Sequence, residues 1–336
     1  MAKVTIRDVA KAAGVSTATV SNALNDVDVI NAETKERVLR MAKELNYVPN
    51  MSGRMLKAGK SKMIGFISSS LTGPYFSKLI EVMQEECEEH GYGLMLIYSQ
   101  KSQIIRNYIF GGGLDGVFVY EGENRFDAQE VAYMEERGIK GILLDREFKG
   151  TTVGSITFDS FYSTYDMTKY LIETGHESIV FLKGPDDVQD SRDREQGYLA
   201  AMKEAGLPAG EHTVLNGQFI EEASYQQVMN WSEAGKEMPD AFVAGNDSSA
   251  MGCVRALKTL NFCVPEQVSV TGVDDIDLAK YFDPAITTIR MPIEQQARQG
   301  VQMLLQLIEG KQPEQMQLKL RGELILRKSV KNRRGL

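Results

Sequence analysis

Four polar side chains in this sequence stand where they could together bind a polyhydroxylated ligand. Asp145 ends the apolar segment GILLD, Asn246 follows AFVAG, Asp274 follows VSVTGV, and Arg194 opens the motif R-x-x-G-Y. Carboxylates accept hydrogen bonds from hydroxyl groups, and a guanidinium group can donate to two neighbouring oxygens. Taken singly, each of these residues is more often a helix cap or a surface charge.

The elements that would position these residues are strands and helices that alternate from Lys62 onward. Segments that predict buried strands are MIGFISS (63–69), GLMLIYS (93–99), GVFVY (116–120), GILLD (141–145), SIVFLKG (178–184), AFVAGND (241–247) and VSVTGVDD (268–275). Helices are expected between them, at about 77–90, 191–205 and 248–260. This alternation predicts an α/β fold with two doubly wound parallel sheets.

The two sheets predict a core of two lobes within residues 62–330. We expect one lobe at about 62–160 with 291–320, the other at about 161–290 with 321–330, and a tail at 331–336. Ligands of such folds bind between the lobes, at the carboxyl ends of the strands.

The first 25 residues predict a different kind of structure, two short helices joined by a tight turn. Thr5 and Asp8 form a capping-box pattern, Gly14 fits the left-handed position after the first helix, and Ser16 can cap the second. Helix pairs of this kind also occur in ordinary cores. Here, however, the start of the second helix presents short side chains that suit base edges in a major groove, namely Thr17, Ala18, Ser21 and Asn22.

A third helix, at about residues 32–45 with Asn31 as its cap, completes a predicted helix-turn-helix headpiece at 1–49. Residues 50–61 follow as a linker, in which NMSGRMLK (50–57) has a weak helical pattern. The headpiece and linker are basic, since residues 1–62 hold 11 Lys and Arg against 6 Asp and Glu, whereas the whole chain has a net charge of −8. A basic head on an acidic body can bind phosphates locally.

Composition narrows the class of protein further. No segment is apolar and long enough to span a membrane, and the N-terminus has no apolar signal segment, so we expect a cytoplasmic protein. The cysteines, Cys87, Cys253 and Cys263, have no metal-ligand spacing, and we expect neither a metal nor a cofactor.

The pattern T-I-x-D-V-A-x-x-A-G-V-S-x-x-T-V-S-x-x-L-N resembles the opening of the LacI/GalR family of bacterial transcriptional regulators, and the resemblance continues through nearly the whole chain. It implies a periplasmic-binding-protein-like core behind the headpiece. It also implies that 50–57 is a hinge helix and that Leu56 matches a leucine wedged into the minor groove, which kinks the duplex. The implied operator contacts are Thr5, Ser16, Thr17, Ala18, Thr19, Ser21, Asn22, Asn25, Asn50, Arg54 and Leu56.

The same resemblance implies an effector site between the lobes. The positions of Asp145, Arg194, Asn246 and Asp274 point at the effector in the family, and Phe219 matches an aromatic position that packs on a sugar face. Phe76, Ser69 and Ser70 could complete the site from the first lobe. The expected ligand is a sugar or a sugar phosphate.

Two departures from the family pattern leave the identity of the effector open. The family's usual D-N-x-x-G-A appears here as DSFYST (159–164), without the Asn and the Gly. The segment QKSQIIRNYIFGGG (100–113) is shorter than usual and borders the predicted site.

We therefore expect a repressor of carbohydrate-utilisation genes that binds a pseudo-palindromic operator in double-stranded DNA. No leucine heptad follows the core, which favours a homodimer. Alternatives are a family regulator controlled by a protein corepressor, a sugar-binding transport protein, and a sugar-active enzyme with two carboxylates. The missing signal segment argues against transport, and the headpiece favours binding over catalysis.

Overall fold

The computed structural model describes residues 4–24, 29–48, 60–121, 126–144 and 146–335. The chain divides into two compact units, Met1–Ser61 and Lys62–Leu336, called the headpiece and the core below. Four predicted operator contacts, Asn25, Asn50, Arg54 and Leu56, lie outside the described residues, as does Asp145. The predicted hinge helix at 50–57 lies outside them too.

The headpiece consists of α1 (Ile6–Ala13), α2 (Thr17–Leu24) and α3 (Ala32–Glu44). Its small core is built on Val9, Val20 and Val38, which are fully buried. One apolar side chain from each helix thus meets the other two, as the helical spacing predicts.

Local capping signals define the ends of these helices as predicted. The backbone N–H of Thr5 donates to Asp8, and Gly14 ends α1 with a φ of 65°. The Ser16 hydroxyl oxygen accepts a hydrogen bond from Thr19 N at 3.1 Å, and Asn31 caps α3. Such caps satisfy backbone groups that a helix end leaves without partners.

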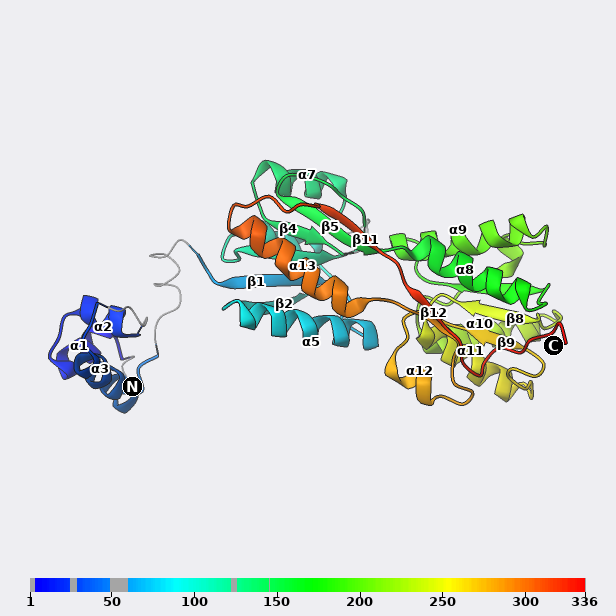
Figure 1. Ribbon diagram of the computed structural model, residues 1–336, viewed down its shortest axis with the longest axis horizontal. Coiled ribbons are helices and arrows are strands. Elements are labelled where there is room, and N and C mark those ends of the chain that lie inside the picture. The colour runs from blue at the N-terminus through cyan, green and yellow to red at the C-terminus, as the bar shows by residue number, and fades with distance from the viewer. Residues whose placement is uncertain (1–3, 25–28, 49–59, 122–125, 145, 336) are drawn as a thin grey trace. The chain divides into compact units, whose positions relative to one another are not determined.

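The core contains two parallel sheets and one short antiparallel pair (Figure 1). The first sheet has the order β11-β5-β4-β3-β1-β2, with β1 (Met63–Ser68), β2 (Gly93–Tyr98), β3 (Gly116–Tyr120), β4 (Gly141–Leu143), β5 (Val153–Phe158) and β11 (Gln317–Leu320). The second sheet has the order β7-β6-β8-β9, with β6 (Ile179–Lys183), β7 (Val214–Asn216), β8 (Ala241–Ala244) and β9 (Ser269–Thr271). The third pairs β10 (Thr288–Arg290) with β12 (Glu323–Ile325).

Helices cover the two larger sheets. The helices of the core are α5 (Pro74–Glu89), α6 (Ser102–Phe110), α7 (Ala128–Glu136), α8 (Ser160–Glu173), α9 (Gln189–Glu204), the 3-10 turn η1 (Glu211–Thr213), α10 (Glu221–Glu233), α11 (Asp247–Thr259), α12 (Asp277–Tyr281) and α13 (Ile293–Ile308). Helices α5 and α13 pack together against the first sheet, and α8 packs on α9 beside the second (Figure 1). We call the first sheet with its helices the first lobe, and the second sheet with its helices the second lobe.

Three segments of chain connect the lobes. The chain leaves β5 for α8, returns between β10 and α13, and passes again between β11 and β12 (Figure 1). The predicted α/β fold with two parallel sheets is confirmed. The residue boundaries expected for headpiece, hinge, lobes and tail stay predictions.

Tertiary structure shifts some predicted elements and adds others. Helix α5 begins at Pro74 rather than near residue 77, because proline fits the first turn of a helix. The sequence pattern missed β5, in which the small polar Ser155 and Thr157 are buried within the sheet. It also missed β10 and β12, three-residue strands that depend on pairing with each other. Among the described residues, no helix is long and apolar enough to cross a membrane.

Candidate functional site

A cavity of about 520 Å³ lies at the carboxyl ends of strands from both sheets. Residues at the ends of β1, β3 and β5 and in the turn after β1 line it from the first lobe, and residues after β6, β7, β8 and β9 line it from the second. This volume and this position suit a small molecule.

All the candidate effector-site residues that the structure describes line this one cavity. They are Ser69, Ser70, Phe76, Arg194, Phe219, Asn246 and Asp274. Sequence reasoning missed others, including Tyr75, Tyr120, Phe158, Asp187 and Asp190. Tyr120 and Phe158 are the last residues of β3 and β5, so the rule that led to Asp274 could have found them.

Aromatic rings form the wall contributed by the first lobe. The ring centroids of Phe76 and Tyr120 lie 5.1 Å apart, and those of Tyr75 and Phe158 lie 6.2 Å apart. Phe76 is only 8% exposed, so most of its surface packs into the core. The Tyr75 hydroxyl donates to Gln296 Oε1 at 2.9 Å, which fastens this wall to α13.

The two serines belong to the turn between β1 and α5. Ser70 N donates to the Ser68 hydroxyl oxygen at 3.1 Å, and the Ser70 and Thr72 hydroxyl groups are also 3.1 Å apart. Ser69 offers its backbone oxygen to Gln100 at 2.6 Å. The turn thus carries short hydroxyl groups at the edge of the cavity.

Phe219 projects from a constrained loop in the second lobe. Phe219 and its neighbour Gln218 have φ values of 57° and 55°, in the left-handed region that such residues seldom adopt. The ring lies directly against Gly184, where a Cβ would stand 2.3 Å from ring atoms. Asn246 holds the loop, since its side-chain nitrogen donates to Phe219 O at 3.1 Å and its oxygen caps α11.

Arg194, Asp190 and Asp274 form the charged part of the cavity. The Arg194 side chain is 6% exposed, and its Nη2 lies 3.8 Å from Asp274 Oδ1. Its Nη1 donates to Gly245 O, its Cζ lies 5.3 Å from the centre of the Phe219 ring, and its Nε has no partner among the described residues. Asp190, 8% exposed, accepts a hydrogen bond from the Ser160 hydroxyl at 2.8 Å.

Burial dominates the electrostatics of both carboxyl groups. Burial raises the pKa of Asp274 to about 7, although Arg194 opposes the shift, and the Asp190 charge adds to it. Burial also raises the pKa of Asp190, again against the pull of Arg194. The Arg194 guanidinium group is therefore the positive charge that opposes the pKa shift of both desolvated carboxyl groups.

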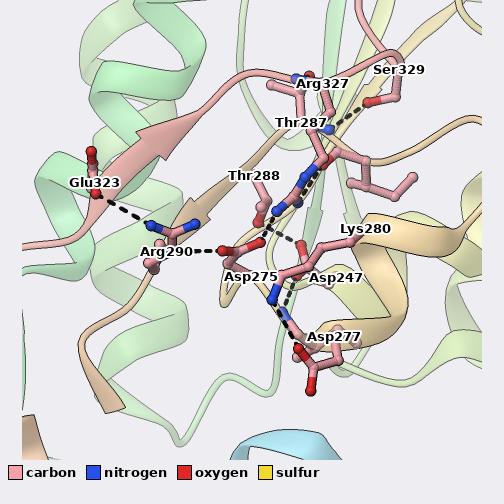
Figure 2. Close-up of polar contacts among 12 residues, drawn as sticks. Asp247, Asp275, Asp277, Lys280, Thr287, Thr288, Arg290, Glu323, Arg327 and Ser329 are labelled. Carbon is pink, nitrogen blue, oxygen red and sulfur yellow. Dashed lines mark hydrogen bonds and ion pairs between the residues drawn. The ribbon is translucent and has the colours of Figure 1, made fainter. Parts of the chain in front are cut away.

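The next carboxylate along the chain is held quite differently (Figure 2). Asp275 accepts a hydrogen bond from Arg290 Nε at 2.7 Å and another from Arg327 Nη2. Arg290 ends β10 and Arg327 follows β12, so Asp275 ties the loop after β9 to both of these strands. Asp247, behind this loop, accepts from Thr288 Oγ1 at 2.6 Å and from a backbone N–H.

A larger and more open groove of about 1270 Å³ borders α5, α12 and α13 and shares Asp274 with the cavity. Its described lining is largely charged and includes no aromatic ring. The smaller cavity is thus the better candidate for a ligand with apolar faces.

The outward face of α2 is the candidate nucleic-acid interface. Thr17 and Ala18 are exposed, and Thr19, Ser21 and Asn22 are partly exposed. The side chains of Thr5 and Ser16 are exposed as well, but both take part in helix caps. The face is therefore made of short side chains around one amide, Asn22.

The described residues contain no cluster of His, Cys, Asp and Glu side chains arranged to hold a metal ion. The site is built for hydrogen bonding and stacking.

Two family models match the sequence. Residues 5–50 match the model for bacterial regulatory proteins of the lacI family, and residues 168–330 match that for periplasmic binding protein-like domains. The HTH-type transcriptional repressor PurR of Photorhabdus laumondii is 34% identical over 335 residues, which cover 97% of this chain and 96% of the relative. The chain belongs to the LacI family.

Solved LacI-family structures have the same fold. A lac repressor dimer bound to operator and the anti-inducer ONPF matches with a TM-score of 0.84 at 26% identity, over 98% of this chain and 99% of that one. The regulator CelR in complex with cellobiose matches with a TM-score of 0.73, also at 26% identity, over 97% of this chain and 100% of that one. The protein is thus a DNA-binding transcriptional repressor of the LacI family, and not an enzyme.

Proposed function

We propose that this repressor works in the cytoplasm as a homodimer on a pseudo-palindromic operator of carbohydrate-utilisation genes. A small sugar-like effector in the 520 Å³ cavity controls its affinity for the operator. The observation that carries the proposal is the cavity wall, where polar groups of Arg194, Asp190 and Asp274 face aromatic rings. Hydroxyl groups of a sugar suit the former, and its C–H faces suit the latter. The solved CelR structure with cellobiose supports this choice of ligand class.

The charges of the cavity favour a sugar without a phosphate group. Among the described lining residues, the acidic ones are Asp187, Asp190 and Asp274, and the basic one is Arg194. A phosphate would bring further negative charge into a desolvated site in which acidic side chains already outnumber basic ones. We therefore narrow the expectation of a sugar or sugar phosphate to an unphosphorylated sugar.

On the operator, we propose that Thr17, Ala18 and Asn22 contact bases, because they lie on the outward face of α2. An Asn side chain can pair with adenine through two hydrogen bonds, and Thr or Ala can contact a thymine methyl group. The remaining candidates are proposed to contact the backbone and the minor groove: Thr5, Ser16, Thr19, Ser21, Asn25, Asn50, Arg54 and Leu56.

Exposed apolar side chains support the proposed dimer. Tyr281 and Leu278 on α12 are 84% and 57% exposed, and Tyr98 on β2 is 58% exposed. β2 is also an edge strand of its sheet, with backbone groups open on one side. Such surfaces are commonly covered by a partner.

Removal of the headpiece tests the DNA-binding part. A chain lacking residues 1–60 should lose operator binding and keep the cooperative unfolding of the core. Affinity of the full chain should fall linearly with log salt. Operator binding by the truncated chain would contradict the proposal.

A thermal-unfolding screen tests the effector part. A ligand that binds the native state raises the melting temperature, and hexoses and disaccharides should do so, unlike their phosphate esters. If no sugar acts and operator binding requires a second protein, a corepressor-controlled regulator replaces this proposal.

A further inference from the structure

The cavity contains more acidic than basic side chains. Asp190 and Asp274 both interact with Arg194, the one cationic side chain among the described residues that line the cavity. Lys319 also acts on Asp190, but its Nζ is already 2.6 Å from a carboxylate oxygen of Glu147. One of the two buried carboxyl groups therefore has no cation of its own.

Both carboxyl groups have acceptor capacity left for a ligand, but Asp274 has an ion pair with Arg194 at 3.8 Å, whereas Asp190 has none among the described residues. Asp190 stands one helical turn before Arg194 on α9 and is more than nine-tenths buried. Its Oδ1 accepts from Ser160, whereas its Oδ2 accepts no hydrogen bond from any residue that the structure describes. Arg194 Nε, similarly buried, has no partner among those residues either.

Each class of ligand would affect this imbalance differently. A neutral sugar would leave one carboxyl group to be protonated or to remain as an unpaired charge, which is unfavourable in a closed site. A phosphate would worsen the imbalance. A ligand ammonium group would remove it, by pairing with the second carboxylate.

The aromatic walls suit a cation as well. Tyr75, Tyr120 and Phe219 line the same cavity as Asp190, and the face of an aromatic ring attracts positive charge. Arg194 already lies over the Phe219 ring, with 5.3 Å between its Cζ and the ring centre. The rings and the carboxylates therefore favour the same kind of ligand.

We propose that the effector carries a cationic amine, an aminodeoxy sugar being the chemical class, and that Asp190 pairs with its ammonium group. This inference rests on the proposed sugar-responsive function. It adds that the sign of the ligand's charge, and not only its hydroxyl pattern, determines which sugars bind.

Matched pairs of sugars test the proposal in the full chain. Each of 2-amino-, 3-amino- and 6-aminodeoxyhexoses is compared with its parent hexose by titration calorimetry at one pH and one salt concentration. In at least one pair the amino sugar should bind about tenfold tighter or more, as a charged hydrogen-bonded pair contributes that much. Asp190→Asn should remove most of this preference.

Asp193→Asn provides the matched control, because it makes the same change of charge on the same helix, three residues from Asp190 and outside the cavity lining. It should keep the preference for the amino sugar. If the parent hexose binds as well as the amino sugar in every pair, the effector does not need an amine, and the proposed sugar-responsive function is unaffected. No binding by any member would overturn both. Equal loss of preference in the two variants would overturn the role of Asp190.

Discussion

Asp274 and Asp275 are neighbours in the chain, yet their surroundings differ. Asp274 faces the cavity, and its ion pair with Arg194 is long, at 3.8 Å. The Asp275 side chain is 2% exposed and accepts hydrogen bonds from Arg290, which ends β10, and from Arg327, which follows β12 (Figure 2). A carboxylate that pairs with side chains of the protein stabilises the fold, whereas a carboxylate with few hydrogen-bond donors around it is available to a ligand.

The largest expected effect is the loss of stability when the Asp275 carboxylate is removed. Asp275→Ala removes a buried carboxylate with which both Arg290 and Arg327 pair, and it frees the loop after β9, so the free energy of unfolding of the core should fall by about 3 kcal/mol. Urea unfolding of the two proteins measures the difference. Asp277→Ala is the control, since its ion pair with Lys280 is exposed to solvent and should contribute little to stability. Equal effects of the two variants would break the comparison.

Replacement of Asp274 should have the opposite effect, a gain of stability whose size depends on pH. Its pKa is raised to about 7 in the folded chain, so folding favours the protonated acid, and this favourable contribution is lost as pH rises from about 4 through 7. Relative to the parent, Asp274→Asn should therefore gain stability between pH 5 and pH 8, on the order of 2 kcal/mol. Melting curves of both proteins across this range provide the measurement. A constant difference between them would mean that Asp274 is not a desolvated acid.

A smaller effect should follow from disturbing the aromatic wall instead of the charges. A methyl group in Gly184→Ala would stand 2.3 Å from the Phe219 ring and displace it, so effector affinity should fall about tenfold. Gly210→Ala is the matched control, because the new methyl group there would lie 3.5 Å from the His212 ring, an ordinary contact, and outside the cavity lining. Calorimetric titration compares the two. Unchanged affinity in Gly184→Ala would place Phe219 outside the ligand contact.

The sequence alone predicted those parts of the molecule that local signals determine. The caps at Ser16 and Asn31, the turn at Gly14 and the apolar strands all depend on neighbouring residues, and the structure confirms them. The approximate location of the cavity followed from the rule that ligands bind at the carboxyl ends of parallel strands.

What the sequence could not predict depends on contacts between distant residues. β10 and β12 are short strands that exist through pairing between distant residues, such as Ile289 and Leu324, which are 35 positions apart in the chain. Asp190 lies on a helix whose burial no local pattern shows, and Phe219 combines a left-handed backbone conformation with packing of its ring on the distant Gly184. The excess of acidic side chains in the cavity could therefore be seen only once the fold showed which residues line it.

We expect a ligand bound at the Asp274 carboxylate to change the affinity of the protein for DNA, and operator titration measures this change. The sugar that gives the largest thermal shift is added at saturation to the parent, to Asp274→Ala and to the control Asp277→Ala. The operator Kd of the parent and of Asp277→Ala should change by about fivefold or more, which is a coupling free energy of about 1 kcal/mol. The operator Kd of Asp274→Ala should not change. An equal change in all three proteins would contradict this prediction.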